Sequence, residues 1–439
     1  MIIKIKVKNV SILTASIFAA TIISACVSTP KIIDMEKLPT EHRWDSGQIS
    51  TLNSLWLKNL ETKMDITNRF VNNPNAATLG KKLFFDTRFS ANGNIACATC
   101  HKPELHFTDG LPQAKGLEQT KRNTPTIVGV SQNTWYFLDG RTDSLWAQAM
   151  GPIENHLEHG SSRNHFAHEI YKDANLRANY EKTFGSMPDI SDLSRFPNHA
   201  GPIKKDKTAS KAWRDMKKAD RKIINDIFVN SAKAIAAFET QIQPKPSRFD
   251  AYVEALVNNN ANKMLSSLST DEAAGLKVFI DMDKGKCMIC HNSPMFTDLE
   301  FHNIATPPLN VKRYDYGRRK GVSKVKRNPF NCLSEYNDAK EKSCDELKYM
   351  VVHEEETMAA FKTPGLRNVS KTAPYMHAGQ YKNLSEVINH YNDPPSTKVG
   401  MNQLLDIDLT DEEMAQLEAF LKTLDSPIAA DPSLLTASN

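Results

Sequence analysis

The feature that most constrains this chain is a five-residue motif that occurs twice. Residues 97–101 read Cys-Ala-Thr-Cys-His, and residues 287–291 read Cys-Met-Ile-Cys-His. Both are C-x-x-C-H, in which two thiols bind a c-type haem covalently and the adjacent histidine coordinates its iron. A zinc site would need further ligands at short spacing, and a disulfide across two residues is an uncommon staple. We therefore predict two haems, held by Cys97, Cys100 and His101 and by Cys287, Cys290 and His291.

The N-terminus has the pattern of an export signal. Three lysines among the first eight residues precede an apolar run, 10–23, of 14 residues, fewer than the about 20 that span a bilayer. Residues 23–26, Ile-Ser-Ala-Cys, are similar to a bacterial lipobox. We expect a lipoprotein signal peptide over 1–26 and a periplasmic protein anchored to the outer membrane through lipid on Cys26. An ordinary signal with a small-residue cleavage site is the alternative.

The two remaining cysteines are Cys332 and Cys344. In an oxidising compartment, a disulfide that closes this small loop is the default expectation. All seven cysteines of the chain are then assigned.

An internal repeat surrounds the two motifs. Residues 79–86 (LGKKLFFD) precede the first motif and residues 274–281 (AGLKVFID) precede the second, and Phe-Thr-Asp follows each motif, at 107–109 and 296–298. The repeat indicates one haem module that has been duplicated.

Helical signals dominate both modules. Ser269–Glu272 and Thr410–Glu413 are capping boxes, and apolar residues recur at helical spacing before the break at Pro244–Pro246. Strand signals are sparse, so we predict a mainly α fold with two cytochrome c-like haem domains in tandem. The predicted segments are an N-terminal segment (27–75), a first haem domain (76–243), a linker (244–268), a second haem domain (269–427) and a C-terminal tail (428–439). The net charge of +4 is small and spread out, and does not suggest a nucleic-acid partner.

Several short motifs accompany the two haem motifs. They are residues 122–125 (RNTP), 139–141 (DGR), 148–152 (QAMGP), 361–369 (FKTPGLRNV) and 372–377 (TAPYMH). With them, the chain resembles the bacterial di-haem cytochrome c peroxidase family, which includes the MauG-like enzymes. The resemblance runs from Leu79 to Leu424, roughly three quarters of the chain.

This resemblance implies that the haem on Cys97 and Cys100 is the peroxidatic one. The family's distal glutamate falls on Glu158 and its distal glutamine on Gln148, with Pro152 shaping the pocket. A positioned carboxylate can move a proton from the inner to the outer peroxide oxygen, first as a base and then as an acid. Outside this context both residues would be read as ordinary surface side chains.

Some peroxidases of the family cap this haem at rest with a histidine. The corresponding segment here, 113–117, contains no histidine. His106 lies nearby, and we read it as a surface residue or a contact to a haem propionate. The resemblance therefore implies an open, five-coordinate haem.

The second haem needs a sixth ligand beside His291, and the resemblance places it at Tyr391. An anionic oxygen ligand favours higher oxidation states of iron, whereas the methionine of electron-transfer relatives raises the reduction potential. From the residues alone, His390, Met376 or Met401 would serve equally.

The resemblance also implies one calcium ion between the haems. Its ligands would be the side chain of Asn123 and the backbone carbonyls of Thr372 and Pro374, hard oxygen donors that suit this ion. One departure concerns Leu138, because most members have a tryptophan there as a relay between the haems. Trp135 and Trp146 are near in sequence only, and we read them as core residues.

We therefore expect a periplasmic di-haem peroxidase. It would reduce hydrogen peroxide to water with electrons from a small redox protein, either a cytochrome c or a copper protein. The alternative is a MauG-like enzyme that uses peroxide to oxidise a Trp or Tyr of a partner protein: Tyr391 and the missing distal histidine favour it, and Leu138 counts against it. A plain di-haem electron carrier is a third reading, against which Glu158 and Gln148 argue. Related enzymes often form homodimers.

Overall fold

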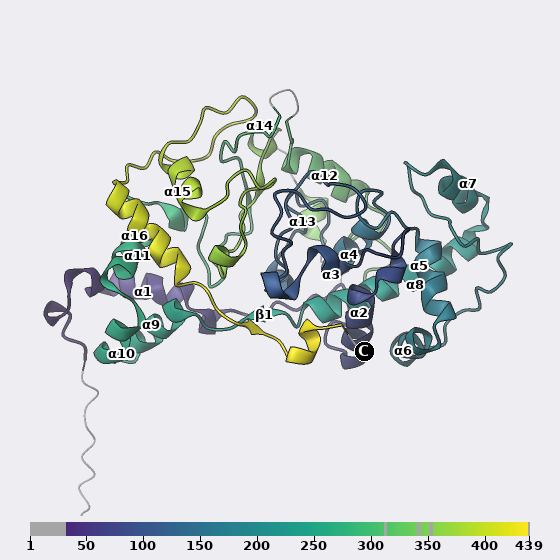
Figure 1. Cartoon of the computed structure of the whole chain (residues 1–439), viewed down its shortest axis with the longest axis horizontal. Helices are drawn as coiled ribbons and strands as arrows, with labels where there is room; N and C mark the ends of the chain where they lie inside the picture. The colour runs from purple at the N-terminus through teal and green to yellow at the C-terminus, as the bar shows by residue number, and fades with distance from the viewer. Residues whose placement is uncertain (1–31, 311–313, 340–343, 351–353, 438–439) are drawn as a thin grey trace, which may run out of the picture.

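The computed structural model describes residues 32–310, 314–339, 344–350 and 354–437. In this part the chain is mainly helical and forms two units, each around its own hydrophobic core (Figure 1). The predicted signal peptide, 1–26, lies outside the described residues. Among those described, none of the helices has the length and apolar character needed to cross a membrane.

The first unit lies on the right of Figure 1 and the second on the left. The helices of the first unit are α2 (Pro74–Phe85), α3 (Cys97–Cys100), α4 (Leu145–Ile153), α5 (Arg163–Lys172), α6 (Ala174–Phe184), α7 (Lys207–Asp215) and α8 (Lys218–Glu239). The others are α1 (Ser46–Leu55), α9 (Arg248–Val257), α10 (Ala261–Ser267), α11 (Thr270–Ile280), α12 (Arg318–Arg327), α13 (Asp345–Lys348), α14 (Glu354–Thr357), α15 (Leu384–Asn392) and α16 (Asp411–Lys422). The strands form two short antiparallel pairs, β1 (Gln243–Pro244) with β4 (Ile428–Ala429) and β2 (Phe301–His302) with β3 (Phe361–Lys362).

The duplicated module is visible as the same helix crossing in both units. Helix α2 crosses α8 and α11 crosses α16, each at the shared glycine of the repeat. A Cβ on Gly80 would lie 1.9 Å from the carbonyl oxygen of Ala234, and one on Gly275 would lie 1.9 Å from that of Gln416. Glycine is therefore required by close backbone approach in both places. The prediction of a mainly α fold with tandem cytochrome c-like domains is confirmed.

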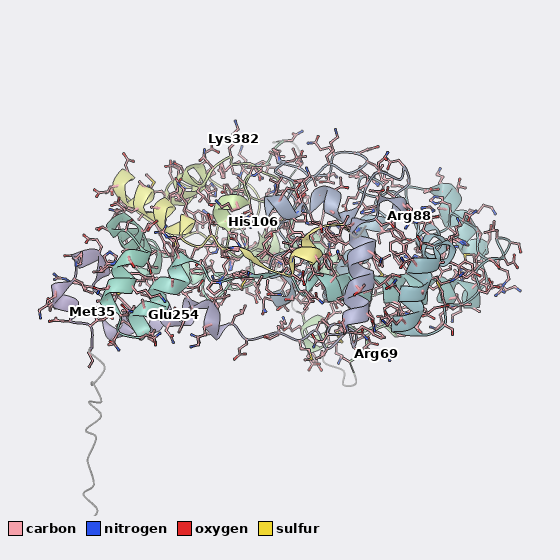
Figure 2. The ribbon with its side chains drawn as sticks, turned by 60° about the horizontal axis from the view of Figure 1, so that its bottom comes forward. Met35, Arg69, Arg88, His106, Glu254 and Lys382 are labelled. Carbon is pink, nitrogen blue, oxygen red and sulfur yellow. A yellow bond between two sulfur atoms is a disulfide. The ribbon has the colours of Figure 1, made fainter. Side chains whose placement is uncertain are left out.

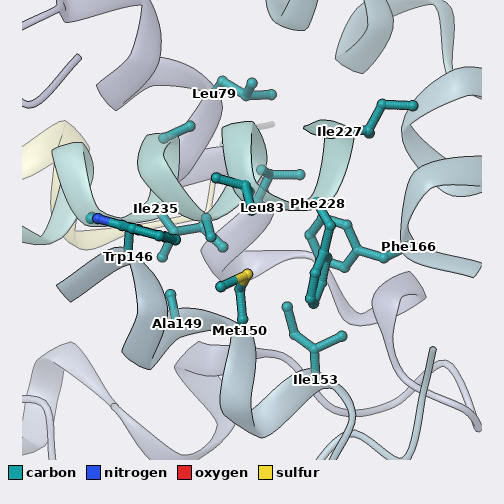
Figure 3. Packing of buried hydrophobic residues seen from close by; sticks show 14 of the residues in the cluster. Leu79, Leu83, Trp146, Ala149, Met150, Ile153, Phe166, Ile227, Phe228 and Ile235 are labelled. Carbon is teal, nitrogen blue, oxygen red and sulfur yellow. The ribbon is translucent and has the colours of Figure 1, made fainter. Parts of the chain in front are cut away.

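Local signals in the sequence account for several helix boundaries. The two predicted capping boxes start α11 and α16. The apolar face of α8 packs against α2 and α4, and Figure 3 shows Ile235 and Phe228 of α8 among Leu83, Trp146 and Met150. The predicted disulfide, Cys332–Cys344, is also present.

The segment predicted as a linker, 244–268, is more than a connection. Helix α8 already ends at Glu239, five residues before the first proline. Ser247 then starts α9 with a further capping box, and Phe249 and Tyr252 of α9 are fully buried in the second core. The N-terminal segment packs there too: the indole of Trp44 donates a 2.7 Å hydrogen bond to the hydroxyl of Tyr252. Figure 2 accordingly shows Met35 and Glu254 at the same end of the molecule. These helices belong to the second unit because their apolar faces complete its core.

Candidate active site

One cavity of about 1870 Å³ contains both C-x-x-C-H motifs in its lining. A single ligand usually occupies about 300–1,000 Å³, so this space suits two large cofactors. The four motif cysteines are free thiols at its wall. Their side chains are therefore available for covalent attachment of haem.

The two motif histidines are oriented in the same way. Nδ1 of His101 lies 3.1 Å from the carbonyl oxygen of Phe107, and Nδ1 of His291 lies 3.0 Å from that of Phe296. With Nδ1–H donated to the backbone, Nε2 carries the lone pair that binds a metal. Burial lowers the pKa of both histidines, which keeps them in the neutral form that coordinates iron. The residues present thus fit two c-type haems.

The repeated Phe-Thr-Asp sequence orients the two motif histidines. Phe107 and Phe296 are fully buried and have positive φ angles of 59° and 57°. This backbone conformation turns each carbonyl toward its histidine. The repeat is visible in the sequence. The pattern does not indicate, however, that the backbone carbonyl of its phenylalanine would bond to the haem-motif histidine.

The predicted distal residues line the cavity beside the first motif. Gln148 extends from α4 and Glu158 from the loop that follows it. The charge of Glu158 contributes to raised pKa values of Cys97 and Cys100, which places its carboxylate near both sulfur atoms. Burial raises the pKa of Glu158, opposed by the attraction of Arg141.

Asn155 is a site residue that the sequence analysis missed. Its Nδ2 donates a 2.6 Å hydrogen bond to Oε1 of Glu158. The bond fixes the carboxyl group and leaves Oε2 as the atom that can exchange a proton. An asparagine three residues before a glutamate is too common for the sequence alone to reveal this role.

The internal repeat extends to the helix over each haem motif. Tyr136 pairs with Thr142 and Tyr375 with Tyr381 in matching bridges, and each bridge precedes a nine-residue helix. The two stretches are offset by 239 residues throughout. Gln148 then corresponds to Val387, and Pro152 corresponds to Tyr391. At the same position, the first unit carries a ring with no donor or ligand atom and the second carries a phenol.

Tyr391 lies in the second half of the cavity. Burial raises its pKa, and the neighbouring Cys290 and Cys287 contribute to the rise. Of the other three ligand candidates, His390 has both ring nitrogens engaged, Nδ1 at 2.9 Å from the hydroxyl of Tyr381 and Nε2 at 2.7 Å from the carbonyl oxygen of Ile304. Met401 is 53% exposed and is not part of the cavity lining. Met376 remains in the lining.

The segment without a histidine, 113–117, packs against the Glu158 loop. A Cβ on Gly116 would lie 2.6 Å from Cα of Glu158, and the backbone N–H of Leu117 donates to the carbonyl of Glu158. His106 lies elsewhere, near the middle of the molecule (Figure 2), and interacts electrostatically with Asp425 and Lys371. It is not among the residues that line the cavity.

The three residues predicted to bind calcium all lie in the cavity wall. Asn123, Thr372 and Pro374 all contribute to the lining. The backbone N–H of Asn123 donates to the carbonyl of His377, and its side-chain Nδ2 donates to the carbonyl of Leu111 at 2.8 Å. The backbone bond joins Asn123 to the 372–377 segment, and the side-chain bond uses only Nδ2, so Oδ1 remains available to a hard cation.

Leu138, the residue at the relay position, is part of the cavity wall. By contrast, Trp146 is fully buried in the first core and Trp135 packs outside the cavity. By the same offset of 239, Leu138 corresponds to His377. The His377 ring stacks on Phe361 with centroids 3.8 Å apart and planes at 7°. Aromatic side chains thus remain in the wall despite the loss of the tryptophan.

Comparison with known proteins agrees with this geometry. A family model described as di-haem cytochrome c peroxidase matches residues 74–258. The methylamine utilization protein MauG of Methylophilus methylotrophus is 29% identical over 357 residues, covering 80% of this chain and 82% of that protein. The cytochrome c551 peroxidase of Pseudomonas aeruginosa is 27% identical over 350 residues, covering 79% and 77%.

Solved structures show the same fold. The diheme peroxidase BthA from Burkholderia thailandensis superposes with a TM-score of 0.58 at 22% identity, over 86% of this chain and 93% of that chain. A MauG-like protein associated with microbial copper homeostasis gives a TM-score of 0.57 at 24% identity, over 86% and 95%.

Proposed function

We propose that the chain is a periplasmic peroxidase of the di-haem cytochrome c peroxidase type, because the model of that family matches residues 74–258 and the MauG and cytochrome c551 peroxidase relatives are 29% and 27% identical to it. It reduces hydrogen peroxide to water with electrons from a small redox protein, a cytochrome c or a copper protein. The observation that carries the proposal is the contrast between the two halves of the cavity. Beside the first motif, the cavity is lined by the carboxyl group of Glu158 and by Pro152, which has no side-chain ligand atom. In the second half, Tyr391 occupies the position equivalent to Pro152.

When bound, the first haem supplies the iron at which peroxide accepts electrons. Glu158 would take a proton from one peroxide oxygen onto Oε2 and deliver it to the other oxygen, which could then leave as water. Asn155 holds the carboxyl group in place through Oε1. Gln148 donates a hydrogen bond to the peroxide, and the ring of Pro152 keeps the approach free.

The second unit receives and stores electrons through His291 and Tyr391. Asn123, Thr372 and Pro374 would hold a calcium ion, whose charge would link the segments that carry these residues. These assignments are supported by the placement of the residues at one cavity. We further propose that lipid on Cys26 anchors the protein to the outer membrane.

A second candidate function is peroxide-dependent oxidation of a Trp or Tyr on a partner protein. The presence of Tyr391 in the second half of the cavity favours it, because an oxygen ligand stabilises oxidised iron. Leu138 at the relay position counts against it.

The two functions differ in what happens after peroxide is added. One equivalent of hydrogen peroxide added to the oxidised holoprotein should change its haem spectrum, and the change should decay as reduced cytochrome c is oxidised. A change that persists in the presence of this donor favours the protein oxidase. An unchanged spectrum contradicts both functions and leaves an electron carrier.

Substitution of Tyr391 tests the second haem. We expect Tyr391→Met to raise the reduction potential of this haem, because a thioether replaces an oxygen ligand, and Tyr391→Phe to remove one axial ligand. Potentiometric titration and the resting spectrum check these results. Tyr381→Phe is the matched control, since its hydroxyl bonds to His390 rather than facing the cavity. Identical spectra and potentials in all variants would assign the ligand elsewhere.

A further inference from the structure

A second buried carboxylate lines the cavity and has no part in the chemistry above. Glu239 is the last residue of α8 and is 5% exposed. Its Oε2 has no hydrogen-bond partner among the described residues. Burial alone raises the pKa of Glu239 to about 8. A buried carboxyl group left without a hydrogen bond or a cation costs stability, so its presence at a cofactor wall calls for a functional reason.

Glu239 belongs to the first haem site. It lines the cavity together with Ile235, one helical turn earlier. Its charge contributes to the raised pKa of Cys97, so the carboxylate lies close to the first attachment point.

The duplicated module shows which residue occupies the equivalent position in the second unit. The crossings at Gly80 and Gly275 align Ala234 with Gln416 and thus α8 with α16. Ile235 then corresponds to Leu417 and Glu239 to Leu421, and both leucines line the second half of the cavity. A leucine lines the second half of the cavity at the position where a carboxyl group lines the first. At this helix position, the first site therefore has an ionisable residue and the second an apolar one.

Few other charges act on Glu239. The titratable groups that interact with it are Cys97, which becomes a thioether when haem is attached, and Tyr136, whose pKa burial raises with further contributions from Asp65, Glu239 and Asp143. Helix α4, packed against α8, has no titratable side chain.

The remaining helices packed against α8 carry charges with partners elsewhere. Lys81 of α2 interacts with Asp431, and Arg163 of α5 pairs with Glu154 at 2.7 Å. Lys82 of α2 is half-buried. The pKa of Glu239 is shifted by burial and not by any of these charges.

We propose that Glu239 is the redox-linked proton acceptor of the first haem. An electron from an external reductant enters the haem, and a proton from solvent forms an O–H bond on the Glu239 carboxylate; when the haem is oxidised, this bond breaks and the proton leaves. The physical basis is that ferric haem carries one more positive charge than ferrous haem. That charge favours the ionised carboxylate, and its loss favours the neutral acid. The second haem, beside Leu421, lacks such a group.

This proposal rests on haem attachment at Cys97 and Cys100 and not on peroxide chemistry, so the two can fail separately. The test is a potentiometric titration of the holoprotein with redox mediators, followed through the haem spectra, from about pH 6 to about pH 9. In the native protein the potential of the first haem should fall as pH rises. In Glu239→Gln this slope should disappear, while the potential of the second haem stays unchanged. A native slope retained in Glu239→Gln overturns the proposal.

Asp226→Asn is the matched control, because it makes the same chemical change at an exposed position of the same helix, where Asp226 pairs with Lys222. It should retain the native slope. Glu239→Leu, which copies the second unit, serves if the glutamine variant does not hold haem. Infrared difference spectra of the native protein give an independent readout: reduction should produce the band of a protonated carboxyl group. Its absence overturns the proposal without any variant.

Discussion

Replacement of Glu158 by glutamine is expected to lower peroxide turnover by about 100- to 10,000-fold, the usual contribution of a positioned acid–base group. The amide has nearly the same shape and can still accept the hydrogen bond from Asn155, but it cannot take the peroxide proton. Both haems should remain attached, because Glu158 makes no covalent link to either. Steady-state oxidation of reduced cytochrome c, together with haem content, checks this result.

Glu118→Gln is the control for Glu158. Glu118 is exposed, is not part of the cavity lining, and lies on the loop whose backbone bonds to Leu157. It should turn over peroxide at the native rate. Equal activity in both variants would remove the catalytic role from Glu158 while leaving the fold and the haem sites intact.

The pH dependence of turnover offers a further check on Glu158. A general base acts only when ionised, and burial raises its pKa above the ordinary value of a glutamate. The rate should therefore fall on the acid side at a higher pH than an exposed glutamate would give. In Glu158→Gln that acid limb should be absent from the residual activity.

The sequence was sufficient for features that depend on neighbouring residues. The haem motifs, the capping boxes of α11 and α16 and the Cys332–Cys344 pairing are all short-range patterns, and the structure contains each of them. The sequence was insufficient for features that form where segments far apart in the chain come together. The prolines before α9 predict a linker because they are a local signal, whereas the core that contains Phe249 is assembled from elements far apart in the chain.

The same limit applies to the site. Glu158 and Tyr391 could be predicted through the resemblance. The hydrogen bond from Asn155 to Glu158 is visible only in the structure. The correspondence between Pro152 and Tyr391 follows from comparing the equivalent helices of the two units. Glu239 has no motif around it. Its significance comes from the crossing of α2 and α8, which matches the crossing beneath Leu421 in the second unit.

Replacement of Arg367 by methionine is expected to destabilise the second unit by about 3–5 kcal/mol, the usual cost of breaking a buried ion pair. Arg367 and Asp250 of α9 are each 1% exposed as side chains, and Nη1 lies 2.7 Å from Oδ2. The guanidinium also donates to the carbonyls of Pro294 and Leu55. It thus ties the segment after the second haem motif to α9 and α1, and its loss leaves the Asp250 carboxylate buried without a partner charge.

Urea unfolding of the holoprotein, followed by circular dichroism, measures this effect. The control is Arg248→Met in the same unit, whose ion pair with Glu272 is half exposed at the arginine and should contribute only about 0–1 kcal/mol.

Burial pushes the pKa of Asp250 upward, but Arg367 outweighs it and holds that pKa below the ordinary value. A carboxyl group of this kind stabilises the fold above its unfolded-state pKa, and the contribution is lost as pH falls through the lowered value. The native protein should therefore lose this contribution in acid, whereas Arg367→Met should lack it at every pH. Equal, small losses in the two variants would show that the motif containing Arg367 is held by packing rather than by its charge.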